Sequence, residues 1–126
     1  MEETNEIVTL ENIGKTNEDR DILAVKISTG GNSSKPIVLL DAGLSPREWI
    51  GTAQALYIIR ELAENSNNKE LITNVDWYVV PLVNPDGYEF THTQVKFQAK
   101  NNTHLHFFKR TVLKSKFPKL SPVSLK

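Results

Sequence analysis

Hydrophobic and polar positions divide most of the chain into short strand-like segments. Residues 6–10 and 21–28 alternate apolar and polar side chains, and residues 37–41 form a short apolar run that begins after Pro36. Residues 75–83 are almost continuously apolar, which is typical of a central strand with both faces buried. The first three segments predict neighbouring strands of one mixed sheet, and the fourth predicts a central strand.

One long helix is predicted between the third and fourth of these strands. Its apolar positions recur at helical spacing from Trp49 to about Asn65, where a run of Asn and Ser ends the pattern. The positions expected on one face are Trp49, Ile50, Ala53, Leu56, Tyr57, Arg60 and Ala63. We interpret Trp49 as a core anchor. Residues 69–74 predict a short helical turn before the next strand.

The strand at 37–41, the long helix and the strand at 75–83 form a predicted βαβ unit. The expected fold class is therefore α/β, with a partial mixed β-sheet and a covering helix. Ligands of open α/β sheets bind near the carboxyl ends of such strands. We therefore expect any chemistry at the turn 42–48 and at the tight polar corner Asn84-Pro-Asp-Gly87.

The segment Ser45-Pro-Arg-Glu48 matches a helix capping box, with Ser at the N-cap, Pro at the first helical position and Glu at the third. In this interpretation the Ser45 hydroxyl accepts from the Glu48 N–H, and the Glu48 carboxylate accepts from the Ser45 N–H. Such a cap stabilises a helix by about 1 kcal/mol. The pattern favours a capping role for Glu48 over a metal-binding role.

Three motifs in the predicted turns carry a family resemblance. They are Ile13-Gly-Lys-Thr-Asn-Glu-Asp-Arg20, Gly43-Leu-Ser-Pro-Arg-Glu-Trp-Ile50, and Asn84-Pro-Asp-Gly-Tyr88 followed by Thr91-His-Thr93. In this order they resemble motifs of the zinc carboxypeptidases of the pancreatic carboxypeptidase A/B family, although Asp19 stands where the family has Gly. The resemblance covers about residues 6–103 and implies the N-terminal portion of a zinc carboxypeptidase-like fold.

The resemblance implies zinc as a cofactor, but the sequence departs from the family at the first ligand. In the family a His and the Glu three residues later bind the metal, and these positions are Ser45 and Glu48 here. A neutral hydroxyl is a poor zinc ligand, so we expect that this chain does not bind zinc tightly. The family's third ligand, a His, and its general-base Glu belong to a C-terminal half that these 126 residues do not contain.

Two basic residues stand at positions that the resemblance associates with peptide substrate. Arg47 matches an Arg that contacts the peptide, and a solvated side chain is the alternative. Lys96 takes the position of an Arg that polarises the scissile carbonyl, when the sequence is read without gaps from Thr91. Lysine donates as a point charge and lacks the fork of arginine. His92 is interpreted as a surface or packed imidazole rather than a ligand.

Charge is distributed very unevenly along the chain. Residues 1–89 contain all 15 acidic residues and 7 basic ones, for a net charge of −8, whereas residues 90–126 contain 8 basic residues and no acids. We expect residues 1–103 to form a truncated carboxypeptidase-like domain and residues 104–126 to be a basic, disordered tail unrelated to the family. Such a tail has the chemistry to contact nucleic acid or acidic lipid, but a solvated tail is the favoured interpretation.

Length and composition narrow the class of protein. A chain of 126 residues with 39% hydrophobic content is long enough for the core of one domain. No apolar stretch is long enough to span a membrane. The acidic start at residues 1–6 contains no secretory signal, whereas the resemblance implies a secreted protein. No cysteine is present, so there is no disulfide framework.

The resemblance implies hydrolytic release of C-terminal amino acids from peptides, and the departures predict that this chain is inactive. Two alternatives stay open. One is a non-catalytic relative or decoy that binds peptide or protein C-termini, and the other is an interaction module that acts through the basic tail. We also expect the strand at 75–83 to present an exposed apolar edge or face, which is an aggregation hazard.

Overall fold

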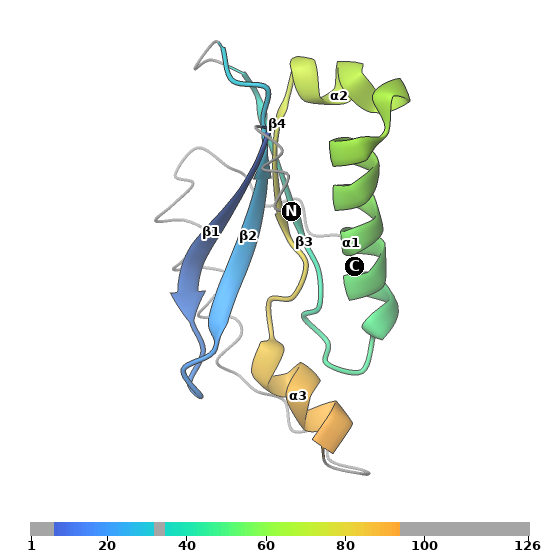
Figure 1. The fold of residues 1–126 in the computed structure, drawn as a ribbon. Helices are drawn as coiled ribbons and strands as arrows, with labels where there is room; N and C mark the ends of the chain where they lie inside the picture. The colour runs from blue at the N-terminus through green and yellow to red at the C-terminus, as the bar shows by residue number, and fades with distance from the viewer. Residues whose placement is uncertain (1–6, 32–34, 94–126) are drawn as a thin grey trace, which may run out of the picture.

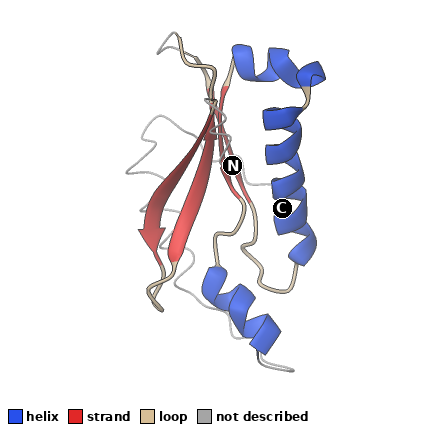
Figure 2. Cartoon of the chain, viewed as in Figure 1, coloured by secondary structure: helices blue, strands red, loops and turns tan. Residues whose placement is uncertain are grey.

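A four-stranded mixed sheet with one long helix packed against it forms the body of the protein (Figure 1). The computed structural model describes residues 7–31 and 35–93. The strands are β1 (Val8–Lys15), β2 (Asp21–Ile27), β3 (Ile37–Asp41) and β4 (Asp76–Val80), and their order in the sheet is β1-β2-β4-β3. Figure 2 shows the helices together on one side of these strands or at their ends.

The strand pairing confirms the predicted βαβ unit. β1 and β2 form an antiparallel hairpin, β2 and β4 are antiparallel, and β3 and β4 are parallel. β4 lies between β2 and β3, as its continuous apolar sequence predicted. The first strand was placed too early in the chain, since β1 starts at Val8 and runs to Lys15. An irregularity between Asn12 and Gly14 interrupts its alternation, and residues 13–15, which the sequence assigned to a turn, belong to this strand.

The described helices are α1 (Trp49–Glu64), α2 (Lys69–Thr73) and α3 (Pro85–Thr93), with a short 3₁₀ turn at Ser66–Asn68. The predicted end of the long helix and the short helical segment after it are therefore confirmed. The predicted corner at Asn84–Gly87 is wrong, because these residues begin α3. The Asn84 Oδ1 accepts from the Gly87 N–H at 3.0 Å, so Asn84 caps the helix and Pro85 follows at its first position.

The face of α1 that meets the sheet is not the predicted one. The buried positions are Ala55 and Leu62, and Ile58 and Ile59 pack with Leu62 against the sheet. Trp49 is 48% exposed, so its predicted role as a core anchor is wrong. Both faces of α1 carry apolar residues at helical spacing, and the stripe that is buried is the one without a charged side chain.

Two hydrophobic clusters stabilise opposite ends of the sheet. Near α2, Ile27 and Leu62 pack with Ile72, and Trp77 lies against them. Near α3, the buried members are Ile13, Ile22, Ala24, Val80 and Val83. Among the described strands the open apolar edge belongs to β3, where Ile37 and Val38 are exposed, and not to the strand at 75–83 as predicted. Val79 and Val80 of β4 are instead fully buried.

Candidate functional site

The segments that follow β3 and β4 lie together at one end of the sheet, as the βαβ pattern predicted. The backbone of Ala42 forms two hydrogen bonds to the β4 exit, the segment 80–84 at the end of β4 and after it. The Ala42 N–H donates to Val80 O, and the Ala42 carbonyl accepts from the Val83 N–H, each at 2.9 Å. The Asn84 N–H donates to Gly43 O at 3.2 Å. These bonds fix the start of the 42–48 loop beside the start of α3.

Gly43 is required by the path of this loop. Its φ is +69°, in the region that side-chain-bearing residues rarely adopt. A Cβ at this position would lie 2.7 Å from Leu82 Cδ1 and 2.8 Å from Thr52 Oγ1. The glycine therefore permits both the backbone turn and the close approach of the two connections.

The predicted capping box does not form. α1 begins at Trp49, and Glu48 precedes it without a side-chain cap hydrogen bond. The Glu48 N–H donates to the backbone oxygen of Ser45 at 3.1 Å, not to its hydroxyl, and the Gly51 N–H donates to Glu48 O at 3.2 Å. Ser45, Pro46 and Arg47 thus form a turn ahead of the helix, because the loop is already fixed by its bonds to the β4 exit. The prediction that Glu48 caps the helix is wrong.

Ser45, Arg47 and Glu48 are all exposed on this turn. Within the described part of the chain, neither Arg47 nor Glu48 forms an ion pair. An open cavity of about 320 Å³ lies beside them, between the end of β3 and the start of α1. Its polar lining includes Asp41, Ser45, Glu48 and Gln54, and its apolar lining includes Leu40, Ile50 and Ile58.

The residues at the loop do not fit a zinc ion. Structural and catalytic zinc sites use at least three protein ligands of the His, Cys or carboxylate type. No group of three such side chains occurs in residues 7–31 and 35–93. His92 stacks on Trp49 with ring centroids 4.4 Å apart, which agrees with its interpretation as a packed imidazole. Lys96 and the predicted tail at 104–126 lie outside the described residues.

Trp49 joins α1 to α3 next to this turn. Its Nε1–H lies 3.1 Å from both Pro46 O and Thr91 Oγ1, and its ring also lies 6.2 Å from that of Tyr88. The Thr91 hydroxyl donates to Tyr88 O at 2.7 Å. The side chain read as a core anchor is therefore a bridge on the surface between two motifs.

The Asp86 carboxylate, which no local sequence pattern marks, joins the first motif, residues 13–20, to α3. Asp86 Oδ1 accepts from Thr16 Oγ1 and from Arg20 NH1, each at 2.7 Å, and Oδ2 accepts from the Glu18 N–H at 3.3 Å. Burial raises the pKa of Asp86, but these hydrogen bonds lower it more, so its pKa lies below the ordinary value. The presence of two family motifs, at 13–20 and at 84–88, was the only hint in the sequence that these segments could meet.

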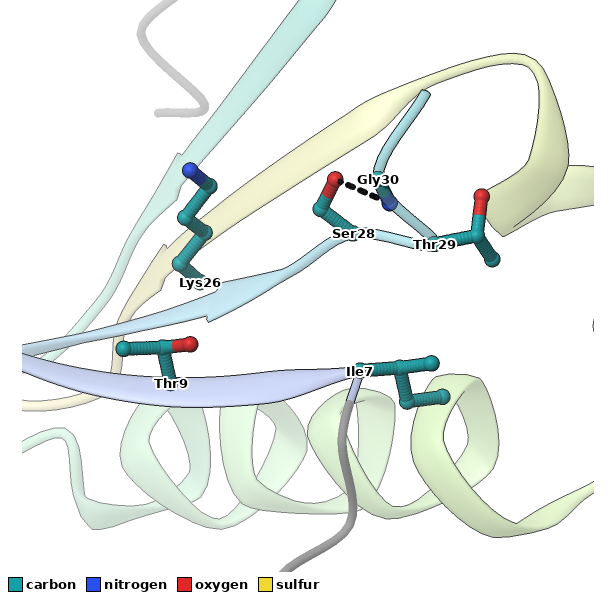
Figure 3. A pocket seen from close by; sticks show the side chains of 6 residues that line it. All are labelled: Ile7, Thr9, Lys26, Ser28, Thr29 and Gly30. Atoms are coloured by element: carbon teal, nitrogen blue, oxygen red, sulfur yellow. Dashed lines mark hydrogen bonds between the residues drawn. The ribbon is translucent and has the colours of Figure 1, made fainter.

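A second cavity, of about 310 Å³, lies at the opposite end of the sheet (Figure 3). The polar side chains of Ser28, Thr29 and Lys26 in its lining already have partners. The Ser28 hydroxyl accepts from Gly30 N–H at 3.2 Å and lies 2.6 Å from Asp76 Oδ1, while the Lys26 ammonium lies 5.6 Å from the centre of the Tyr78 ring. These contacts indicate a structural role, and the 42–48 loop remains the candidate site.

The fold is a mixed α/β domain, and comparison with known proteins identifies its family. The zinc carboxypeptidase family model matches residues 1–112, so this chain belongs to that family. It is 47% identical over 103 residues to zinc carboxypeptidase A 1 of Drosophila melanogaster, a match that covers 77% of this chain and 24% of the relative. It is 35% identical over 99 residues to carboxypeptidase B of Astacus astacus, covering 78% of this chain and 32% of the relative.

Solved structures agree with this assignment. The crystal structure of carboxypeptidase A from Helicoverpa armigera superposes with a TM-score of 0.66 at 38% identity, covering 69% of this chain and 22% of that chain. The fold is therefore part of the carboxypeptidase fold, as predicted from the motifs. The chain spans roughly a quarter to a third of the relatives' length, from 22% to 32% in these three comparisons.

Proposed function

We propose that this chain contributes a peptide-C-terminus-binding surface of the carboxypeptidase type and does not hydrolyse peptides by itself. The observation that carries the proposal is the composition of the 45–48 turn. It presents Ser45 and Glu48 on one exposed turn, and no group of three metal-binding side chains occurs among the described residues. A single carboxylate with a neutral hydroxyl does not hold a catalytic zinc ion.

Arg47 supplies the binding chemistry in this proposal. Its guanidinium is exposed on the turn and forms no ion pair within the described chain, so it is free to meet a peptide carboxylate. A guanidinium matches a carboxylate with two parallel hydrogen bonds. The neighbouring cavity offers the apolar side chains of Leu40, Ile50 and Ile58 to an apolar residue of the peptide. Peptide and protein C-termini are thus the proposed partners.

Binding is tested with the purified 126-residue chain and a short peptide with a free C-terminal carboxylate. The matched probe is the same peptide as its C-terminal amide. We expect the acid to bind at least roughly fivefold more tightly, which corresponds to about 1 kcal/mol, and Arg47→Gln to remove the difference. Equal affinity for acid and amide would exclude this proposal.

Loss of the metal site is tested separately with zinc titrations. The unchanged chain is expected to bind zinc weakly and to release no C-terminal amino acid. Ser45→His adds an imidazole beside Glu48 and is expected to tighten zinc binding at least roughly tenfold, an effect that Glu48→Ala should cancel. Stoichiometric, Glu48-dependent zinc binding by the unchanged chain, with peptide hydrolysis, would contradict the proposal.

A second candidate function is zinc-dependent hydrolysis by a longer protein that contains these residues. It is favoured by one observation, the short share of the relatives that the chain spans. The test is the intact mass of the natural protein, captured with an antibody against residues 36–60. A mass near 14.2 kDa favours binding without hydrolysis, whereas a mass more than twice as large favours the hydrolase.

The remaining predictions from sequence concern Lys96, the tail and the compartment. Oxyanion contact by Lys96 and a basic, disordered tail at 104–126 stay predictions, although the family match extends to residue 112. Salt-sensitive binding to nucleic acid or acidic lipid, lost on deleting 104–126, would favour the interaction module instead.

A secreted location stays an expectation from the family. In the described part of the chain no helix is long and apolar enough to cross a membrane.

A further inference from the structure

Two of the three family motifs are joined through one side chain. Asp86 lies in the first turn of α3, yet its partners Thr16 and Arg20 belong to the turn between β1 and β2, 70 and 66 residues away. The Thr16 hydroxyl also accepts from the Arg20 N–H at 3.1 Å, and Arg20 pairs with Glu18 as well. The Asp86 side chain is 14% exposed and that of Arg20 is 37% exposed, so the carboxylate is partly buried while its partners stay in contact with water.

The contacts continue from α3 to the 42–48 loop. Gly87 lies against Pro46, since a Cβ on Gly87 would approach Pro46 Cβ to 2.9 Å. Asn84 Nδ2 lies 3.5 Å from Leu44 O. Trp49 reaches from the other end of the loop to Thr91 of α3. The loop that carries Arg47 and Glu48 therefore rests on α3, and α3 is fixed to the β1–β2 turn through Asp86.

We propose that Asp86 is a positioning residue of the candidate site, which holds α3 against the β1–β2 turn and thereby fixes the loop that presents Arg47 and Glu48. The proposal rests on the proposed function for the meaning of the site, but the position of the loop is measurable without any ligand. A residue that only supports folding would disturb the whole domain, whereas a positioning residue disturbs the α3 end alone.

The two tryptophans of the chain provide reporters at opposite ends. The Trp49 Nε1–H lies between Pro46 O and Thr91 Oγ1, beside the loop. The Trp77 Nε1–H donates to Leu71 O at 3.0 Å, at the far end of the sheet. Their indole N–H resonances in nitrogen–proton correlation spectra report separately on the two ends of the full 126-residue chain.

Asp86→Asn is the test variant, and Asp21→Asn is its matched control. Asp21 pairs with Lys15 at 3.1 Å on the same hairpin, but its side chain is 49% exposed and this pair lies within the hairpin. We expect Asp86→Asn to move the Trp49 indole resonance and leave that of Trp77 in place, whereas Asp21→Asn should move neither. Thr16→Val, which removes one bond to Asp86 at nearly the same volume, is the milder variant if Asp86→Asn does not fold.

A functional measurement completes the test. Asp86→Asn should weaken binding of the free-carboxylate peptide at least roughly fivefold, while Asp21→Asn changes it by less than about twofold. Movement of both indole resonances, or of neither, would overturn the positioning role. If the unchanged chain binds the free-carboxylate peptide and its C-terminal amide equally well, the proposed function fails. The two indole resonances still decide whether Asp86 positions the loop.

Discussion

Both ends of the sheet contain an apolar cluster, and they differ in the polar contacts added to it. At the α2 end, Ile27, Leu62 and Ile72 exclude water and form a conventional apolar core between helix and sheet. At the α3 end, Asp86 and Asn84 add hydrogen bonds between segments distant in sequence. An apolar cluster tolerates exchange of one apolar side chain for another of similar volume, whereas a hydrogen bond requires a particular donor and acceptor. The end where the Asp86 carboxylate accepts three hydrogen bonds is the one that carries the family motifs.

The largest expected effect comes from the apolar cluster at the α2 end. Ile27 is fully buried, so Ile27→Ala removes packed methylene groups and leaves a cavity, and we expect a loss of about 3 kcal/mol in the free energy of unfolding. Leu23→Ala on the same strand is the control, because Leu23 is 37% exposed and should cost less than about 1 kcal/mol. Urea unfolding of both variants measures the difference. Equal losses would show that Ile27 does not occupy a close-packed core.

Two glycines with the same backbone conformation compare the ends directly. Gly43 has φ +69° at the α3 end and Gly30 has φ +71° near α2. Gly30→Ala meets no atom within 4 Å, so only the backbone strain of about 1 kcal/mol applies. Gly43→Ala adds a clash with Leu82 and Thr52, so we expect a total of about 2–3 kcal/mol in urea unfolding. A Gly43→Ala loss no larger than that of Gly30→Ala would mean that the loop relaxes freely.

The strands were predictable because their signal is local. The continuous apolar run that includes Val79 and Val80 placed β4 at the centre of the sheet correctly. The buried face of α1 was not predictable from period alone, because Leu56 and Tyr57 repeat as regularly as Ile58 and Ile59 do. The absence of a charged residue in the stripe that contains Ile58 was the better signal.

The location of the candidate site was predictable, but its support was not. The βαβ pattern placed the 42–48 loop beside Asn84 without any structure. The capping box at Ser45 failed because tertiary bonds from Ala42 and Gly43 to the β4 exit set the path of the loop before the helix begins. Asp86 was missed because its partners are 66 and 70 residues away, beyond the reach of any local pattern.

Acid should weaken the α3 end selectively through Asp86. The pKa of Asp86 is lowered in the folded protein, so its contribution is fully present above its unfolded pKa of about 3.9 and is lost as the pH falls through the folded value. Near neutral pH we expect the free energy of unfolding of the unchanged chain to exceed that of Asp86→Asn by about 2 kcal/mol, because the variant loses hydrogen bonds to a charged group. The difference should shrink below about pH 4.

The measurement is urea unfolding of both proteins across this range of pH. Lowered pKa values of Asp21 and Glu61 affect the unchanged chain and the variant alike, so the difference between the two proteins isolates Asp86. A difference that stays constant down to the lowest pH would show that the charge of Asp86 does not contribute to the stability of the folded chain.

The smallest effect is expected for an ion pair that water surrounds. Arg60 and Glu64 lie 3.1 Å apart on the outer face of α1, with side chains 74% and 67% exposed, whereas the Asp86 side chain is 14% exposed. Exposed pairs at this spacing contribute about 0.3 kcal/mol, and the order Arg before Glu is the less favourable one. Arg60→Gln should therefore lower the free energy of unfolding by no more than about 0.5 kcal/mol.

Salt decides whether the Arg60 effect is electrostatic. Most of the loss should disappear at about 1 M sodium chloride, where the screening length is close to the separation of the two charges. Under the same conditions Asp86→Asn should keep a larger share of its effect, because a partly buried pair is screened less than an exposed one. If salt removed both effects equally, the bonds of Asp86 would be as open to solvent as those of Arg60, and the contrast between a partly buried polar cluster and an exposed helix surface would be wrong.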